Sequence, residues 1–139
     1  MEALETLFAA AVAARSNAYA PYSKFAVGAA IRTPSGAIFS GANVENAAYP
    51  VGTCAEAGAI AAMVAAGEYR IAEILVLGAG EALVTPCGAC RQRIREFADD
   101  AARIHVAGPE GLRATFTLAE LLPEAFGPSL RYIKGPKEP

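Results

Sequence analysis

Three cysteines set the strongest constraint on how this chain folds. Cys87 and Cys90 stand three residues apart in the segment 85–92 (TPCGACRQ), and Cys54 lies in a second segment, 53–60 (TCAEAGAI). Each segment has the pattern of a loop that enters a helix, and residues three apart share one helix face. If the two helix starts meet, three thiols converge on one point. The odd number of cysteines argues against a disulfide framework and favours a metal site.

Apolar spacing and turn residues divide the chain into four helices and five strands. Helical periodicity predicts helices around residues 4–12, 54–67, 87–98 and 117–122. Short apolar segments predict strands at 25–33, 37–45, 73–79, 103–108 and 112–116.

Local signals place several ends of these elements. The first helix carries its apolar residues at Leu4, Leu7, Phe8, Ala11 and Val12. The sequence PSG at 34–36 makes the first two strands a hairpin, and Gly67 is a usual position for a helix end. A capping box from Thr117 to Glu120 predicts the start of the last helix.

The order α-β-β-α-β-α-β-β-α predicts one α/β domain over residues 1–139, in which helices pack on a single sheet. No segment approaches the ~20 apolar residues of a membrane span, and the N-terminus lacks the basic region of a signal peptide. We therefore expect a cytoplasmic protein, in a compartment where thiols stay reduced and a cysteine cluster more often means a metal or catalytic site.

The charge balance bears on the binding partner. The chain has 12 basic and 14 acidic residues without a basic stripe, which argues against a nucleic acid polymer as partner and favours a small molecule. The hydrophobic content of 54% is high for a short soluble chain and points to apolar surface buried between subunits.

The three cysteines predict a catalytic zinc site, with one Zn²⁺ per chain. Three protein ligands leave one tetrahedral position open, which distinguishes a catalytic from a structural zinc. Two helix N-termini offer positive dipole ends to the thiolates. The alternatives are a redox pair of Cys87 and Cys90 with Cys54 incidental, and a closed site with His105 as fourth ligand. His105 lies in the middle of a predicted strand, where a packed or edge histidine is the simpler interpretation.

Glu56 stands two residues after Cys54 and is the candidate proton carrier. Zinc lowers the pKa of a bound water to ~7, and a carboxylate near the open position can take that proton and pass it on. The simpler alternative is a favourable acid in the first turn of a helix. Because Glu56 accompanies three converging cysteines, we favour the catalytic interpretation over a non-catalytic zinc-binding module.

Five motifs together resemble the short, three-cysteine cytidine deaminases. These motifs are PYSKFAVGAA, GANVENAAYP, CAE, PCGACRQ and ELLPEAFGP, in the order and spacing of that family. The resemblance implies a three-layer α/β/α sandwich around a five-stranded mixed sheet, and a homotetramer with shared active sites. It assigns zinc to Cys54, Cys87 and Cys90, and proton transfer to Glu56.

The same resemblance implies the substrate contacts. Asn43 and Glu45 match the pair that binds the ribose; two apart on a strand, they point to one face while Val44 points to the other. Phe25 matches a ring that packs on the pyrimidine. The remaining matches are Tyr49 near a subunit contact, the Ala55 main chain near the base, and Phe126, which the family donates from a neighbouring subunit.

The chain departs from the family pattern directly after Glu56. The family usually has an arginine there, which offsets the thiolate charge, whereas this chain has Ala57 followed by Gly58. We expect the helix dipoles, together with Arg91 or a basic group of another subunit, to take over this function.

The implied reaction is hydrolytic deamination of cytidine and deoxycytidine in pyrimidine salvage. Water adds at C4 of the pyrimidine, and Glu56 moves the proton to N3 before ammonia leaves. Blasticidin-type deaminases share the fold and the cysteines but lack the sugar-binding pair, so Asn43 and Glu45 favour an ordinary nucleoside.

Overall fold

The computed structural model describes residues 2–128, and its elements follow the predicted order. They are α1 (Glu2–Arg15), β1 (Val27–Arg32), β2 (Ile38–Ala42), the short 3-10 helix η1 (Tyr49–Val51), α2 (Ala55–Ala65), β3 (Glu73–Gly78), α3 (Gly88–Phe97), β4 (Arg103–Gly108), β5 (Gly111–Thr117) and α4 (Leu118–Leu121). The strands form one sheet in the order β2-β1-β3-β4-β5. Only β3 and β4 are parallel among these neighbours, so the predicted five-stranded mixed sheet is confirmed.

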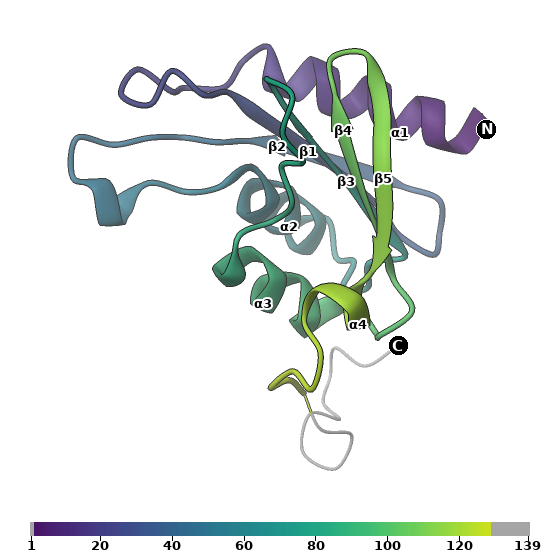
Figure 1. The fold of residues 1–139 in the computed structure, drawn as a ribbon. Coiled ribbons are helices and arrows are strands. Elements are labelled where there is room, and N and C mark those ends of the chain that lie inside the picture. The colour runs from purple at the N-terminus through teal and green to yellow at the C-terminus, as the bar shows by residue number, and fades with distance from the viewer. Residues whose placement is uncertain (1, 129–139) are drawn as a thin grey trace.

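The sheet lies between two layers of helices. Figure 1 shows α1 on one side of the sheet and α2 and α3 on the other. Two apolar cores correspond to these sides: Leu7 and Ala11 of α1 pack with Leu75 of β3, while Met63 and Ile94 belong to the core under α2 and α3. The predicted three-layer sandwich is therefore confirmed, although Val12 of the expected apolar face of α1 is 42% exposed.

The predicted ends of two helices are confirmed in detail. Gly67 has a positive φ of 86°, and the main-chain N–H of Glu68 returns to the carbonyl of Met63, as in a helix ended by glycine. Thr117 and Glu120 form both hydrogen bonds of the capping box. These local signals fix where α2 ends and α4 begins.

The second strand is shorter than predicted. It ends at Ala42, and the next residues leave the ladder, with Val44 bridging to Tyr19 on one side and to Thr53 on the other. Asn43 and Glu45 therefore lie beyond the sheet instead of alternating along a regular strand. The physical reason is that their side chains bind the main chain of residues 22–27, as described below.

A close approach between β2 and α2 positions the start of that helix. A Cβ atom built on Gly41 would lie 2.4 Å from the main-chain nitrogen of Ala59 and 2.6 Å from the carbonyl oxygen of Ala55. No side chain larger than hydrogen fits between two backbones at that distance. The first turn of α2 consequently rests directly on β2.

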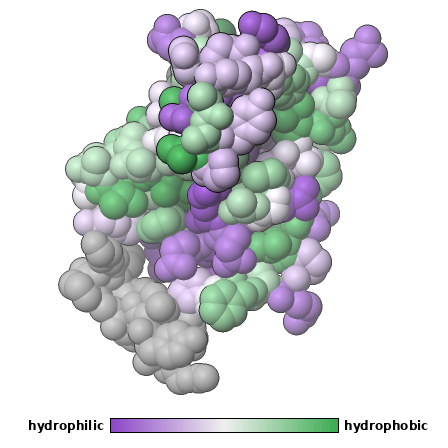
Figure 2. Space-filling model, turned by 90° about the vertical axis from the view of Figure 1, so that its left-hand side faces the viewer, coloured by the Kyte–Doolittle hydropathy of each residue, from purple (hydrophilic) through white to green (hydrophobic). Residues whose placement is uncertain are grey.

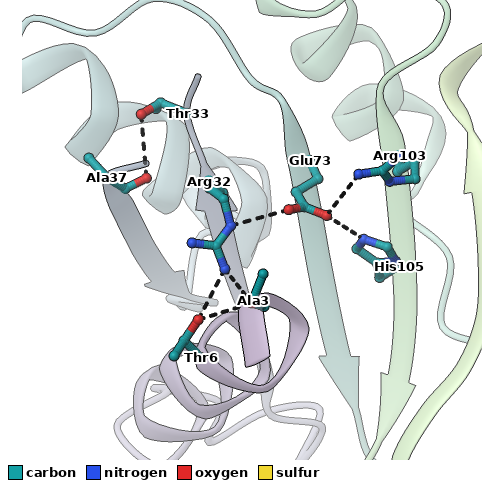
Figure 3. Close-up of polar contacts among 8 residues, drawn as sticks. All are labelled: Ala3, Thr6, Arg32, Thr33, Ala37, Glu73, Arg103 and His105. Atoms are coloured by element: carbon teal, nitrogen blue, oxygen red, sulfur yellow. Dashed lines mark hydrogen bonds and ion pairs between the residues drawn. The ribbon is translucent and has the colours of Figure 1, made fainter. Parts of the chain in front are cut away.

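A polar cluster on the opposite face ties α1 to the sheet (Figure 3). Arg32 donates to the Glu73 carboxylate at 3.2 Å and to Thr6 Oγ1 and the Ala3 carbonyl of α1. His105 Nε2 lies 2.8 Å from the same carboxylate. Burial alone would raise the pKa of Glu73, but the hydrogen bonds from His105 and Arg32 outweigh this effect and lower the pKa. The cluster therefore holds a charged carboxylate beneath α1.

None of the helices within residues 2–128 combines the length and the apolar content needed to cross a lipid bilayer.

Candidate active site

The three cysteines meet where two helices begin. Cys54 is the N-cap of α2 and Cys87 the N-cap of α3, one residue before the helical turns in which they were predicted, and Cys90 is the third residue of α3. Their Sγ atoms all lie within 4.8 Å of one another, and all three thiols are free. The predicted convergence is confirmed.

The donor set fits a tetrahedral metal ion. Zn–S bonds of about 2.3 Å in a tetrahedron separate the sulfurs by roughly 3.8 Å. Small side-chain movements are enough to bring the three Sγ atoms, which lie within 4.8 Å of one another, to that spacing. Cys90 is buried, Cys54 half-buried and Cys87 exposed. Cys54 and Cys87 also line a cavity, so a fourth coordination position would open toward that cavity.

The environments of the thiols differ. Burial raises the pKa of Cys90, and the nearby Glu56 carboxylate raises it further. Burial likewise raises the pKa of Cys54. At Cys87, burial alone would raise the pKa, but hydrogen bonds with the main chain and the thiol of Cys90 outweigh this effect and lower it. The start of α3 thus favours a thiolate at the most exposed of the three positions.

Glu56 is a buried carboxyl group beside the cysteines. The residue is 4% exposed, lies in the first turn of α2, and lines the same cavity as Cys54 and Cys87. Burial raises its pKa above 4.5, although Cys90 and Arg93 act in the opposite direction. The raised pKa makes this carboxyl group easier to protonate than an exposed one, which suits a residue that carries protons.

A cavity of about 580 Å³ joins these groups. Seven of the residues predicted for the site line it: Asn43, Glu45, Tyr49, Cys54, Ala55, Glu56 and Cys87. Other residues that line the cavity, among them Tyr22, Val84 and Thr85, had no signal in the sequence pattern. Val44 lines the cavity too, which the predicted alternation had excluded. The volume suits a ligand of the size of a nucleoside.

Asn43 and Glu45 hold the loop that forms one wall of the cavity. Asn43 Oδ1 accepts from the Val27 N–H at 2.9 Å, and its Nδ2 donates to the Phe25 carbonyl at 2.9 Å. Glu45 Oε1 accepts from the N–H groups of Tyr22 and Ser23 at 2.9 and 3.0 Å.

The Glu45 carboxylate also accepts from the Ser23 hydroxyl. An amide and a carboxylate can make about four hydrogen bonds each. Asn43 and Glu45 therefore both retain capacity toward a ligand in the cavity, in addition to their structural bonds.

Three predicted aromatic residues differ in their relation to the cavity. Tyr49 lines it and packs edge-on against Tyr22, with ring centroids 6.0 Å apart. Phe25 and Phe126 are not among the lining residues. Phe126 is 82% exposed, and its carbonyl accepts a hydrogen bond from Gln92 Nε2 at 2.8 Å. Within one chain the structure does not bring these two rings to the cavity.

Apolar side chains surround this region on the outside of the molecule. Tyr19, Val44 and Val51 are more than half exposed, and so is Tyr49. Figure 2 views the face from which the loop 43–53 projects, where green apolar residues are interspersed with purple polar ones. The exposed apolar groups lie on segments next to the cavity.

The cation at the cysteine cluster is Arg93 and not Arg91. Arg91 donates to the carbonyls of Pro86 and Leu121 at 2.7 and 2.8 Å and to Thr85 Oγ1 at 3.0 Å, so its donors are directed to oxygen atoms. Arg93 Nη1 instead donates to Cys90 Sγ at 3.3 Å. The position three residues after Cys90 signals this contact, because such residues share a helix face.

His105 does not belong to the cysteine cluster. Its ring bonds Glu73 at 2.8 Å and Thr115 at 2.9 Å, on β4 beside α1. The packed strand histidine that the sequence favoured is therefore confirmed over a fourth metal ligand.

Comparison with known proteins identifies cytidine deaminases as relatives of this chain. The family model described as "Cytidine and deoxycytidylate deaminase zinc-binding region" matches residues 1–106. The cytidine deaminase of Sporosarcina psychrophila is 42% identical over 123 residues, 88% of this chain and 90% of that protein. That of Halalkalibacterium halodurans is 38% identical over 122 residues, 88% of this chain and 92% of that protein.

Solved structures agree with these sequence matches. The crystal structure of cytidine deaminase from Burkholderia pseudomallei superposes with a TM-score of 0.82 at 42% identity, covering 88% of this chain and 98% of that one. The enzyme from Mycobacterium tuberculosis gives a TM-score of 0.77 at 35% identity, covering 89% of this chain and 97% of that one.

Proposed function

This chain belongs to the cytidine and deoxycytidylate deaminase family, and from that membership we propose that it hydrolyses cytidine and deoxycytidine to the corresponding uridines and ammonia. The proposal is carried by three thiols within 4.8 Å of one another and a buried carboxyl group beside them, at a cavity lined by Cys54, Cys87 and Glu56. A redox pair would need neither the third thiol nor the carboxyl group. The reaction is a step of pyrimidine salvage, which we place in the cytoplasm.

The metal of the proposal is one zinc ion per chain, held by Cys54, Cys87 and Cys90. When bound, zinc supplies Lewis-acid activation of water at neutral pH. The soft thiolate donors and their position at the starts of α2 and α3 support this choice. Every further step of the proposed reaction uses side chains of the protein.

Glu56 moves the protons of the proposed reaction. It takes a proton from the attacking water and delivers it to N3 of the pyrimidine while the C4–O bond forms. It then transfers the hydroxyl proton to the exocyclic amine, the C4–N4 bond breaks, and ammonia leaves as the C4 carbonyl forms. Its burial at 4% exposure keeps the carboxyl group in place and away from bulk water.

The sugar is bound, in this proposal, at the wall formed by Asn43 and Glu45. One amide hydrogen of Asn43 and one lone-pair site of Glu45 remain after their bonds to the loop 22–27. The same bonds hold both side chains in fixed orientations, which lowers the entropy cost of binding hydroxyl groups. The main chain of Ala55 lies at the cavity and supplies polar groups to the base.

The proposed assembly is a homotetramer with shared active sites. Apolar residues exposed on the loops beside the cavity, Tyr49 and Val51 among them, support a partner surface there. Phe126 is 82% exposed and does not line the cavity of its own chain, and Phe25 is 38% exposed. In the assembly, Phe25 packs on the pyrimidine of its own subunit and Phe126 reaches the cavity of a neighbour. Sedimentation of purified protein tests this, and a monomer at micromolar concentration would contradict it.

An ammonia-release assay tests the proposed reaction. Purified protein is incubated separately with cytidine, deoxycytidine, cytosine and blasticidin S. Release from both nucleosides, with little from the free base, is the expected result, because the free base lacks the sugar that Asn43 and Glu45 bind. Release from blasticidin S alone would assign the chain another substrate, and no release from a zinc-loaded protein would contradict the proposal.

A further inference from the structure

One guanidinium group contacts the cysteine cluster without a function in the proposed reaction. Arg93 Nη1 donates to Cys90 Sγ at 3.3 Å. Cys90 is fully buried, whereas Arg93 is an exposed residue of α3. One end of the guanidinium therefore reaches a buried sulfur while the rest of the side chain meets solvent.

The cluster requires positive charge around it. A divalent ion held by three thiolates has a negative net charge, and the buried carboxyl group of Glu56 adds to it whenever it is ionised. The positive ends of α2 and α3 offset part of this charge. A charge-assisted hydrogen bond to sulfur offsets more, because such bonds are about twice as strong as neutral ones.

Arg93 and Ala57 each follow one of the cysteines at the same spacing in the sequence. Residue 57, in the first turn of α2, follows the N-cap Cys54 by three positions, and residue 93 follows Cys90 by three positions along α3. Residues three apart on a helix share a face, so a long side chain at either position can reach its cysteine. The chain has alanine at the first of these positions and arginine at the second.

We propose that Arg93, on α3, is the positioning residue that offsets the thiolate charge in this chain. An arginine at position 57 would have the same effect from α2. The inference rests on the zinc site proposed above. It assigns Arg93 to retention of the metal by Cys90, and it accounts for the absence of an arginine after Glu56.

The rate at which zinc leaves the loaded protein tests this inference. Parent, Arg93→Gln, Arg93→Lys and Arg70→Gln are loaded with zinc, and transfer to a chromophoric chelator is followed in absorbance. Arg70 is an exposed arginine beyond the far end of α2, so Arg70→Gln is a control with the same change of charge. Arg93→Gln should release zinc about tenfold faster than the parent, Arg93→Lys should lie between them, and Arg70→Gln should match the parent.

A spectroscopic measurement separates charge at sulfur from a general loosening of the fold. In cobalt-substituted protein, the sulfur-to-metal charge-transfer band should shift in Arg93→Gln and stay in place in Arg70→Gln. The double variant Ala57→Arg/Arg93→Gln should regain slow zinc release if the two positions are equivalent. Thermal unfolding confirms that each variant is folded.

Several results would overturn the inference. Zinc release from Arg93→Gln at the parental rate, or an equal acceleration in Arg70→Gln, removes Arg93 from metal retention. Fast release from a folded double variant contradicts the equivalence of positions 57 and 93. A parent protein that binds no zinc would instead overturn the proposed metal site itself, so the two failures are distinguishable.

Discussion

Replacing Gly41 with alanine should disturb the contact that positions the active-site helix. The added Cβ would lie 2.4 Å from Ala59 N, 2.6 Å from Ala55 O and 2.7 Å from Gly58 C, all of them main-chain atoms of α2. The helix must move by about 1 Å to regain ordinary contact distances of about 3.5 Å. Overpacking of this kind costs roughly 1–3 kcal/mol. Unfolding entropy of about 2.1 cal/mol/K per residue converts this cost into a Tm lower by roughly 3–10 °C.

Gly58 offers a matched control on the other side of the same contact. A Cβ there would lie 3.5 Å from Gly41 Cα, an ordinary van der Waals distance. Because alanine is favoured over glycine inside a helix by about 0.5–1 kcal/mol, Gly58→Ala should leave Tm unchanged or raise it slightly. Circular dichroism of the metal-loaded proteins measures both values. A Tm for Gly41→Ala within about 1 °C of the parent would refute the close approach as a constraint on α2.

Three further predictions address individual side chains. Glu56→Gln should keep the fold and the metal but lower kcat by roughly 10²- to 10⁴-fold, because glutamine cannot carry a proton; a kcat near the parent's would remove Glu56 from the reaction. Asn43→Ala and Glu45→Ala should raise KM for cytidine and reduce the preference over cytosine, because both variants lose a partner for the sugar hydroxyls; an unchanged preference would make both residues structural only. Because the pKa of Glu73 is lowered in the folded state, its ionised carboxylate stabilises the fold at pH values above the ordinary pKa of 4.5, and this stabilisation is lost as the pH falls through the folded-state pKa. The Tm difference between parent and Glu73→Gln should therefore shrink on acidification. A pH-independent difference would argue against the ion pairs.

Local sequence signals predicted the framework of this fold because the physical causes are local. Gly67 ends α2 and the box from Thr117 to Glu120 begins α4, each through hydrogen bonds within a few residues. The continuous apolar segment that became β3 is buried on both faces, as a central strand should be. The convergence of the cysteines followed from their position at two helix starts.

Tertiary contacts determined what the sequence patterns did not reveal. Asn43 leaves the strand because its amide binds main-chain groups of Phe25 and Val27, which are 16 to 18 residues away in the chain. Arg91 is adjacent to a cysteine in sequence, but its helical phase directs it to Leu121 of α4. The i to i+3 spacing of Cys90 and Arg93 was readable, and it would have identified the correct arginine.

Deamination by this chain should depend on one zinc ion held by the three cysteines. Removal of metal with a chelator, followed by titration with zinc, measures cytidine-dependent ammonia release and bound zinc on the same sample. Activity should be lost with the metal and return in proportion to zinc, reaching its maximum near one ion per chain. Full activity of a protein shown to be free of metal would contradict the proposed dependence on zinc.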